Sequence, residues 1–146
     1  MKISANQLAP QLKKSLLPCY LVSGDEPLLV EESLDAIRAA AREQGFGARE
    51  LFVHSTGFDW SEFSAVGSNL SLFAERRIIE LRLPTGKPGV KGSATIADFA
   101  AEAADDMLLL VSAPKLDRKA QNAKWVKAIE SRGGLVQVWP VDLRGW

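Results

Sequence analysis

The residues best placed for phosphate chemistry follow Tyr20–Ser23, an apolar stretch that predicts a β-strand and runs into Gly24. A glycine directly after a strand begins the phosphate-binding loop of many nucleotide hydrolases, which also needs a second glycine, a lysine and a hydroxyl residue at fixed distances. Counted from Gly24, those three positions hold Leu29, Val30 and Glu31. The motif has the right place in the chain but the wrong side chains for a nucleotide.

Two further features argue against nucleotide binding. Asp25 and Glu26 put negative charge where a phosphate would sit, and each like-charge contact would cost about 4 kcal/mol at ~4 Å and an effective dielectric of ~20. A second stretch rich in glycine and lysine, residues 86–93, lacks a Gly-Lys-Ser/Thr triplet, and Pro88 removes a backbone donor. We expect a mobile surface loop over residues 85–93.

Other catalytic chemistry has little support in the sequence. His54 is the single histidine and has no Cys or His nearby with which to form a metal site. Cys19, the only cysteine, lies in an apolar strand and is expected to be a small core residue, so the chain can form no internal disulfide and suits a reducing cytoplasm. We expect no catalytic residue, metal or cofactor, and we keep a nucleotide-hydrolysing α/β enzyme of the P-loop type as the alternative.

A short apolar cluster just ahead of Arg76-Arg77 needs a burial partner; it reads Asn69-Leu70-Ser71-Leu72-Phe73. On a helix, Leu70 and Phe73 share a face, whereas Leu72 lies about 100° from Phe73. If the helix ends near Leu70, Leu72 and Phe73 lie on an exit turn and could point outward. Composition alone favours burial in the core of this chain, and a pocket on another protein is the alternative.

The charge pattern excludes strong global attraction to nucleic acid or membrane. Eighteen basic and eighteen acidic residues cancel, and no apolar run approaches the roughly 20 residues of a membrane helix. Basic residues do crowd one stretch: Lys115, Arg118, Lys119, Lys124, Lys127 and Arg132. We expect a solvated helix face there, with a contact to phosphate or to an acidic partner as the alternative.

The elements that must position these residues alternate regularly between strand and helix. The expected strands are 20–23, 51–55, 76–83, 107–111 and 135–139. The expected helices are 4–16, 27–45, 59–70, one near 96–103, and a basic-faced helix around Trp125–Ile129 that ends at Gly133. Asp25 is the expected N-cap of the second helix, and Asp59 with Glu62 forms the expected capping box of the third. Strictly alternating elements predict an α/β fold with a five-stranded parallel sheet and helices on both faces.

Several motifs together resemble a known family. They are Tyr20–Leu29, Ser71–Ala74, Arg76-Arg77 and Lys115–Asp117. In this order and spacing they resemble the N-terminal domain of the DNA polymerase III delta subunit, a component of the bacterial clamp loader. The resemblance implies a RecA-like AAA+ module with a degenerate phosphate loop and no ATP hydrolysis of its own. It also implies a domain over residues 1–140, with 141–146 beginning a linker to a lid domain absent from this sequence.

The resemblance further implies a partner for the apolar cluster. Family members bind the ring-shaped beta sliding clamp and open it for loading onto primed DNA, within a cytoplasmic holoenzyme whose activity is that of a DNA-directed DNA polymerase, a nucleotidyltransferase. Leu70, Ser71, Leu72 and Phe73 match the general clamp-binding motif Gln-Leu-Ser/Asp-Leu-Phe, and Asn69 takes the place of the glutamine with a side chain one methylene shorter. Leu72 and Phe73 would be the anchors, while Leu70 would help seat the helix. Other implied partners are the gamma/tau and delta prime subunits, through domains mostly absent here, and DNA in the assembled complex; no membrane is implied.

Overall fold

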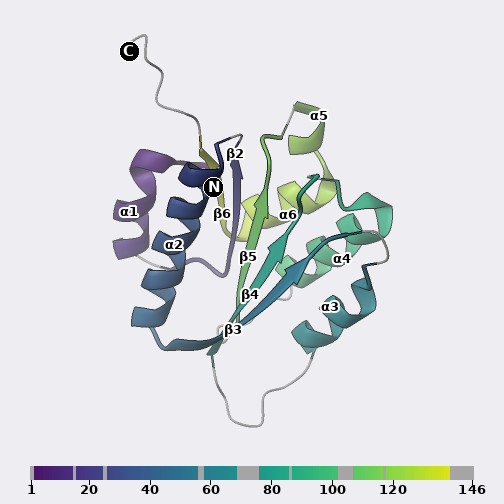
Figure 1. Cartoon of the computed structure of the whole chain (residues 1–146), viewed down its shortest axis with the longest axis horizontal. Coiled ribbons are helices and arrows are strands. Elements are labelled where there is room, and N and C mark those ends of the chain that lie inside the picture. The colour runs from purple at the N-terminus through teal and green to yellow at the C-terminus, as the bar shows by residue number, and fades with distance from the viewer. Residues whose placement is uncertain are drawn as a thin grey trace.

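A six-stranded parallel sheet organises the part of the chain that the structure describes (Figure 1). The computed structural model describes residues 2–14, 16–24, 26–55, 58–68, 76–85, 87–101, 107–116 and 118–138. The strands are β1 Lys2–Ser4, β2 Cys19–Gly24, β3 Phe46–Val53, β4 Arg76–Arg82, β5 Met107–Ala113 and β6 Gly134–Val138. Their order is β1-β6-β2-β5-β4-β3, and every pairing is parallel.

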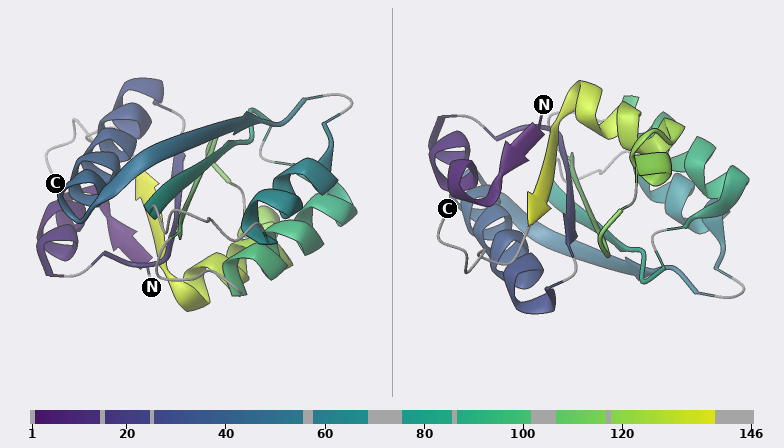
Figure 2. Two further views of the ribbon diagram at one scale, coloured as in Figure 1. Left: turned by 90° about the horizontal axis from the view of Figure 1, so that it is seen from below. Right: turned by 90° about the horizontal axis from the view of Figure 1, so that it is seen from above.

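Helices cover both faces of this sheet, as Figure 2 shows. Their bounds are α1 Ala5–Lys14, α2 Pro27–Glu43, α3 Trp60–Ser68, α4 Gly89–Ala101, α5 Arg118–Gln121 and α6 Lys124–Arg132. The helices α1 and α2 lie on one face, while α3, α4 and α6 lie on the other (Figures 1 and 2). Parallel strands require such crossover helices, because a short hairpin cannot join them.

The core is divided by the sheet into two apolar clusters. On the side of α1 and α2, Leu34 and Ile37 pack against the strands, whereas on the other side Phe63, Ile96 and Ile129 do so. All seven residues of β5 are buried, which confirms the expectation for a strand covered on both faces. The expected α/β class, parallel sheet and helices on both faces are therefore confirmed.

Two strands differ from the expectation. The sheet has a sixth strand, β1, which pairs with β6 through Ile3 and Val136 and is too short to produce a readable pattern. The strand expected at 51–55 begins earlier, at Phe46, because pairing with β4 starts there. Burial alternates along all of β3, but the residues after Phe46 read Gly47-Ala48-Arg49-Glu50 and have no large apolar side chain that would mark a strand in the sequence.

Two local expectations were wrong in detail, and a third is confirmed. The mobile loop expected over 85–93 is shorter, because α4 begins at Gly89. The N-cap of α2 is Glu26, whose side chain makes no capping hydrogen bond; Asp25, the expected cap, lies outside the described residues. The end of α2 near Gly45 is confirmed, since this glycine has a φ of 93°, a left-handed conformation that suits glycine after a helix.

Candidate functional site

The carboxyl edge of the sheet holds a hollow where nucleotides bind in many α/β proteins. Its volume is about 460 Å³, and Gly24, Val30, Glu31 and Arg82 are among the residues lining it. Val30 and Glu31 occupy the places of the lysine and the hydroxyl residue of a phosphate loop. The hollow therefore exists, but an aliphatic side chain and a carboxylate stand where a nucleotide hydrolase would hold phosphate and Mg²⁺.

Close packing between two strands explains why residue 24 is a glycine, without any need for a phosphate. A Cβ atom added at Gly24 would lie 2.5 Å from the carbonyl oxygen of Val138 on β6. Such an approach is far inside ordinary van der Waals contact, so β2 and β6 can lie this close only because Gly24 has no side chain. The first glycine of the loop is thus explained by the sheet alone.

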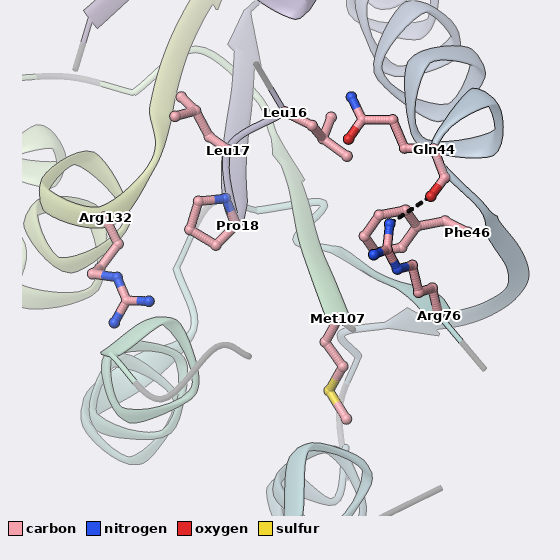
Figure 3. A pocket seen from close by; sticks show the side chains of 8 residues that line it. All are labelled: Leu16, Leu17, Pro18, Gln44, Phe46, Arg76, Met107 and Arg132. Atoms are coloured by element: carbon pink, nitrogen blue, oxygen red, sulfur yellow. Dashed lines mark hydrogen bonds between the residues drawn. The ribbon is translucent and has the colours of Figure 1, made fainter. Parts of the chain in front are cut away.

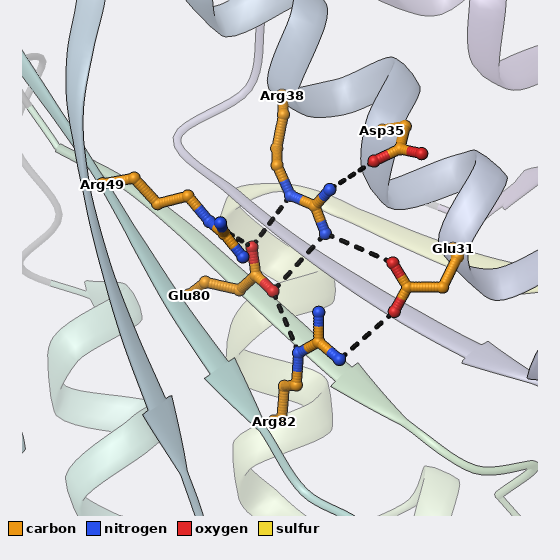
Figure 4. A network of polar contacts seen from close by, with 6 residues as sticks. All are labelled: Glu31, Asp35, Arg38, Arg49, Glu80 and Arg82. Carbon is orange, nitrogen blue, oxygen red and sulfur yellow. Dashed lines mark hydrogen bonds and ion pairs between the residues drawn. The ribbon is translucent and has the colours of Figure 1, made fainter.

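Glu31 is held by two arginines in a network of ion pairs that Figure 4 shows. Its carboxylate lies 3.3 Å from a guanidinium nitrogen of Arg82 and 3.6 Å from one of Arg38. Arg38 is largely buried and also pairs with Asp35 one turn earlier on α2. The carboxylate at the Mg²⁺ position of a phosphate loop is therefore engaged by cations of the chain itself.

The centre of this network is Glu80, on β4, which has no exposed surface. Its carboxylate accepts hydrogen bonds from the Nε atoms of Arg38 at 2.9 Å, Arg49 at 3.1 Å and Arg82 at 3.2 Å. Burial raises the pKa of Glu80, but the hydrogen bonds and charges of Arg49 and Arg38 outweigh it and leave the pKa below its ordinary value. Glu80 is therefore ionised at neutral pH and has three cationic partners.

Sequence reasoning missed Glu80, although a signal was present. A carboxylate between Ile79 and Leu81 at the centre of a strand must find cationic partners if that part of the strand is buried on both faces. One partner, Arg82, lies two residues away on β4 itself, but Arg38 and Arg49 come from α2 and β3, which only the fold brings beside β4. The sequence could therefore indicate the need for cationic partners but not the whole network.

The remaining titratable groups in the described residues offer little chemistry. No three of their His, Cys, Asp and Glu side chains come together in a way that could hold a metal ion. Burial raises the pKa of the Cys19 thiol to about 11, which keeps it protonated and unreactive, and its burial confirms the expected core role. His54 packs beside the rings of Phe58 and Trp60, at centroid distances of 5.6 and 5.3 Å. No helix in the described ranges is long and apolar enough to cross a membrane.

The predicted clamp-binding residues, Asn69, Leu70, Ser71, Leu72 and Phe73, lie outside the described residues. The elements on either side are described: α3 ends at Ser68 and β4 begins at Arg76. Since β4 begins at Arg76, this residue lies at the amino edge of the parallel sheet, opposite the carboxyl hollow.

That amino edge has a hollow of its own, with a volume of about 290 Å³ (Figure 3). Leu16, Pro18, Phe46 and Met107 supply apolar lining. Arg76, the first residue of β4, donates a hydrogen bond of 2.6 Å to the carbonyl oxygen of Gln44, and its guanidinium carbon lies 5.6 Å from the ring centroid of Phe46.

Arg132, at the end of α6, also lines the amino-edge hollow. Its guanidinium donates a 2.5 Å hydrogen bond to the carbonyl oxygen of Ala101. Four other basic residues of the stretch singled out by sequence are exposed, as expected for a solvated face: Lys115, Lys119, Lys124 and Lys127. Trp125 on the same helix is buried.

The sheet order and the hollow without phosphate-binding residues define a domain with an AAA+-like α/β fold. Its backbone is similar to the DNA clamp loader delta protein of Bacillus subtilis, with a TM-score of 0.71 and 18% sequence identity over 96% of this chain and 44% of that chain. At this identity the likeness establishes the fold alone.

Sequence comparison identifies the family. Residues 20–138 match the family described as DNA polymerase III, delta subunit. The chain is 33% identical over 132 residues to the DNA polymerase III subunit delta of Escherichia coli K12, and 26% identical over 124 residues to that of Haemophilus influenzae. This chain therefore belongs to the DNA polymerase III delta subunit family. The alignments cover 90% and 85% of this chain but only 38% and 36% of those relatives, so the chain spans less than two fifths of their length.

Proposed function

We propose that this chain is the clamp-binding part of a clamp loader delta subunit, which binds the beta sliding clamp and opens the ring for loading onto primed DNA. The observation that carries the proposal is the family match over residues 20–138. The engagement of Glu31 by Arg38 and Arg82 supports a role without ATP hydrolysis by this chain. Its contribution to the holoenzyme is thus mechanical, through binding, and the polymerase chemistry belongs to other subunits.

The clamp contact is assigned to Leu70, Ser71, Leu72 and Phe73, with Asn69 at the glutamine position. Leu72 and Phe73 enter an apolar pocket on the clamp, and burial of each contributes roughly 1.5–3 kcal/mol. Two such anchors give about 3–6 kcal/mol before ordering costs, which corresponds to millimolar to tens of micromolar affinity. Tighter binding therefore needs additional contacts from a face of the same domain.

Ring opening follows only if the opened clamp is bound more tightly than the closed one, because a ligand shifts an equilibrium by its differential affinity. Residues 1–140 act as the clamp-binding domain, and 141–146 begin the linker to a lid domain. The gamma/tau and delta prime subunits assemble through the further domains of the cytoplasmic loader, and DNA joins the complete complex.

The test is a double variant, Leu72→Ala with Phe73→Ala, measured for clamp binding and for thermal stability. The proposal expects clamp binding to fall at least about a hundredfold, since two buried anchors are lost, with a nearly unchanged melting temperature. The matched control is Leu28→Ala with Val90→Ala, which removes two exposed apolar side chains, 72% and 92% accessible, from the starts of α2 and α4. A melting temperature that falls while the folded protein still binds the clamp would show that 69–73 belongs to the core.

A further inference from the structure

The strand β3 is an edge strand: among the described strands it pairs with β4 alone, and its other side, called here the outer side of β3, pairs with none (Figure 2). Proteins commonly protect an edge strand of eight residues with lysine or proline, because its free backbone groups can pair with another chain. β3 contains neither residue, and its two charged side chains, Arg49 and Glu50, pair with residues of β4. The outer side of β3 is therefore open to a further strand.

The backbone groups of β3 show which residues such a strand would meet. The N–H of His54, just past the end of β3, donates to the carbonyl oxygen of Arg82 on β4 at 2.9 Å. Successive strand residues direct their N–H and C=O groups to opposite sides, so those of Arg49, Leu51 and Val53 point away from β4. Three residues thus present a row of donors and acceptors to a strand that would lie about 4.8 Å away.

The side chains of these three residues share the face of the sheet on which α2 lies. Leu51 is in register with Glu80, which pairs with Arg38 of α2, and alternate residues of a strand point to one face. Leu51 and Val53 are each 47% accessible and are two of the four large apolar side chains exposed in the described part of the chain. The apolar side chains of an added strand would pack directly against them.

Arginines surround the first half of the outer side of β3. Arg38, Arg42 and Arg49 line a hollow of about 300 Å³ between α2 and this strand. Glu80 pairs with both Arg38 and Arg49, as Figure 4 shows. Arg42 is exposed, and no carboxylate of the described residues pairs with it. Since directly opposite side chains of neighbouring strands have Cβ atoms about 5 Å apart, an acidic residue beside Arg49 would lie at this hollow and add a counter-ion to it.

We propose that the outer side of β3 binds an extended acidic segment of another protein, which adds a seventh strand to the sheet. The segment places an acidic residue beside Arg49 and Arg42, and apolar residues at the alternate positions beside Leu51 and Val53. A second copy of this chain is disfavoured, because antiparallel pairing of two β3 strands about residue 50 would bring the two Arg49 side chains to diagonal positions on one face. The site needs no contact with the clamp, so it goes beyond the proposed function.

Binding of short fluorescent peptides to the whole chain tests the inference. One peptide has the core Glu-Thr-Val-Thr-Val between Gly-Ser flanks, and a second has the reversed core, because an added strand can run in either direction. At least one of them should bind saturably, and less tightly at high salt. Lysine in place of the glutamate should weaken that binding about tenfold. Binding of neither peptide at about 1 mM would overturn the proposal.

Surface variants locate the bound peptide. Leu51→Lys puts a charge into the apolar row, and Arg42→Glu reverses the charge at the hollow, so each should weaken binding at least about tenfold. Val90→Lys and Lys127→Glu are the matched controls, because they make the same kinds of change at exposed positions of α4 and α6. Both controls should bind as the wild type does, with melting temperatures measured in parallel. Equal binding by all four variants would place the peptide elsewhere and overturn the proposal.

Amide hydrogen exchange followed by NMR gives a readout at single residues. In the free chain, the amides of Leu51 and Val53 should exchange faster than that of Phe52, whose N–H faces β4. The bound peptide should slow exchange at Leu51 and Val53 and leave Phe52 unchanged. If these amides are already protected in the free chain and light scattering gives the mass of a dimer, the occupant is a second copy and the assignment to an acidic segment is wrong.

Discussion

At the scale of single residues, Glu80 shows how the charges of this protein are used. Three arginines from α2, β3 and β4 converge on one fully buried carboxylate. If one member of a buried ionic cluster is removed, the remaining charges stay buried without a counter-ion and the folded protein loses stability. This loss is larger than the loss from replacing the whole ionic group by apolar residues. The cluster therefore fixes α2 against the β3–β4 half of the sheet.

Replacement of Glu80 by glutamine should destabilise the protein by roughly 3 kcal/mol or more, because three guanidinium groups lose their shared counter-ion. Chemical denaturation at pH 7 measures this change. The control is Glu50→Gln on β3, because the partly exposed Glu50 carboxylate lies 3.7 Å from Arg77. This substitution should lower the free energy of unfolding by less than about 1 kcal/mol. Equal effects of the two substitutions would contradict the central role of Glu80.

The same carboxylate predicts a pH dependence. The pKa of Glu80 is lower in the folded protein than its unfolded value of about 4.5, so the unfolded state takes up a proton first as the pH falls. The stability from Glu80 is complete above the unfolded pKa and is lost as the pH falls toward the folded pKa. The stability difference between the wild type and Glu80→Gln should therefore shrink below about pH 4.5, and a difference that grows with acidity would contradict this assignment.

At the scale of elements, most of the fold could be predicted from periodicity and turn residues. The apolar run at 107–111 became β5, and the helix from Pro27 ends before Gly45 as expected. The failures have physical reasons: β1 has only three residues, and the first half of β3 has no large apolar side chain after Phe46 that would mark a strand. The beginning of α4 was hidden because Gly89 and Gly92 suggested a loop. Gly92 instead leaves room for Trp60, since an added Cβ would lie 2.4 Å from the indole ring.

Gly24 and Gly45 make a matched pair for testing close packing between elements. Gly24→Ala would force a methyl group against the Val138 carbonyl, which the sheet holds in place, so we expect a loss of several kcal/mol. At Gly45 the nearest atom to an added Cβ belongs to the Arg76 side chain, at 3.8 Å, so there is room for a methyl group. Gly45→Ala should therefore lower the stability by only about 1 kcal/mol, because alanine disfavours the left-handed backbone conformation at this position. Urea denaturation compares the two, and a Gly24→Ala protein as stable as Gly45→Ala would contradict the packing role of Gly24.

At the scale of the whole molecule, the two edges of the sheet have different chemistry. The carboxyl edge has a hollow at the place of a nucleotide site, and the Glu31 carboxylate in it is engaged by arginines. The amino edge has an apolar hollow flanked by Arg76 and Arg132. The lack of a phosphate-binding lysine could be predicted from the sequence by counting positions after Gly24. The second hollow could not, because its lining comes from segments between Leu16 and Arg132 that only the fold brings together.

The carboxyl edge predicts that this chain does not bind ATP. Equilibrium dialysis with labelled ATP and Mg²⁺ should show no saturable binding at millimolar nucleotide, because Val30 offers no charge to phosphate and Glu31, which is engaged by Arg38 and Arg82, replaces the hydroxyl that would bind Mg²⁺. Tight, Mg²⁺-dependent binding would instead favour the alternative of a nucleotide-hydrolysing enzyme.

The central claim, that the clamp binds the amino edge of this domain through 69–73, is tested most directly by amide hydrogen exchange with and without the clamp. We predict slower exchange in peptides covering 69–77. Peptides covering 24–31 and 112–116 at the carboxyl edge should exchange at the same rate in both states. Protection at the carboxyl edge with none at 69–77 would contradict the account.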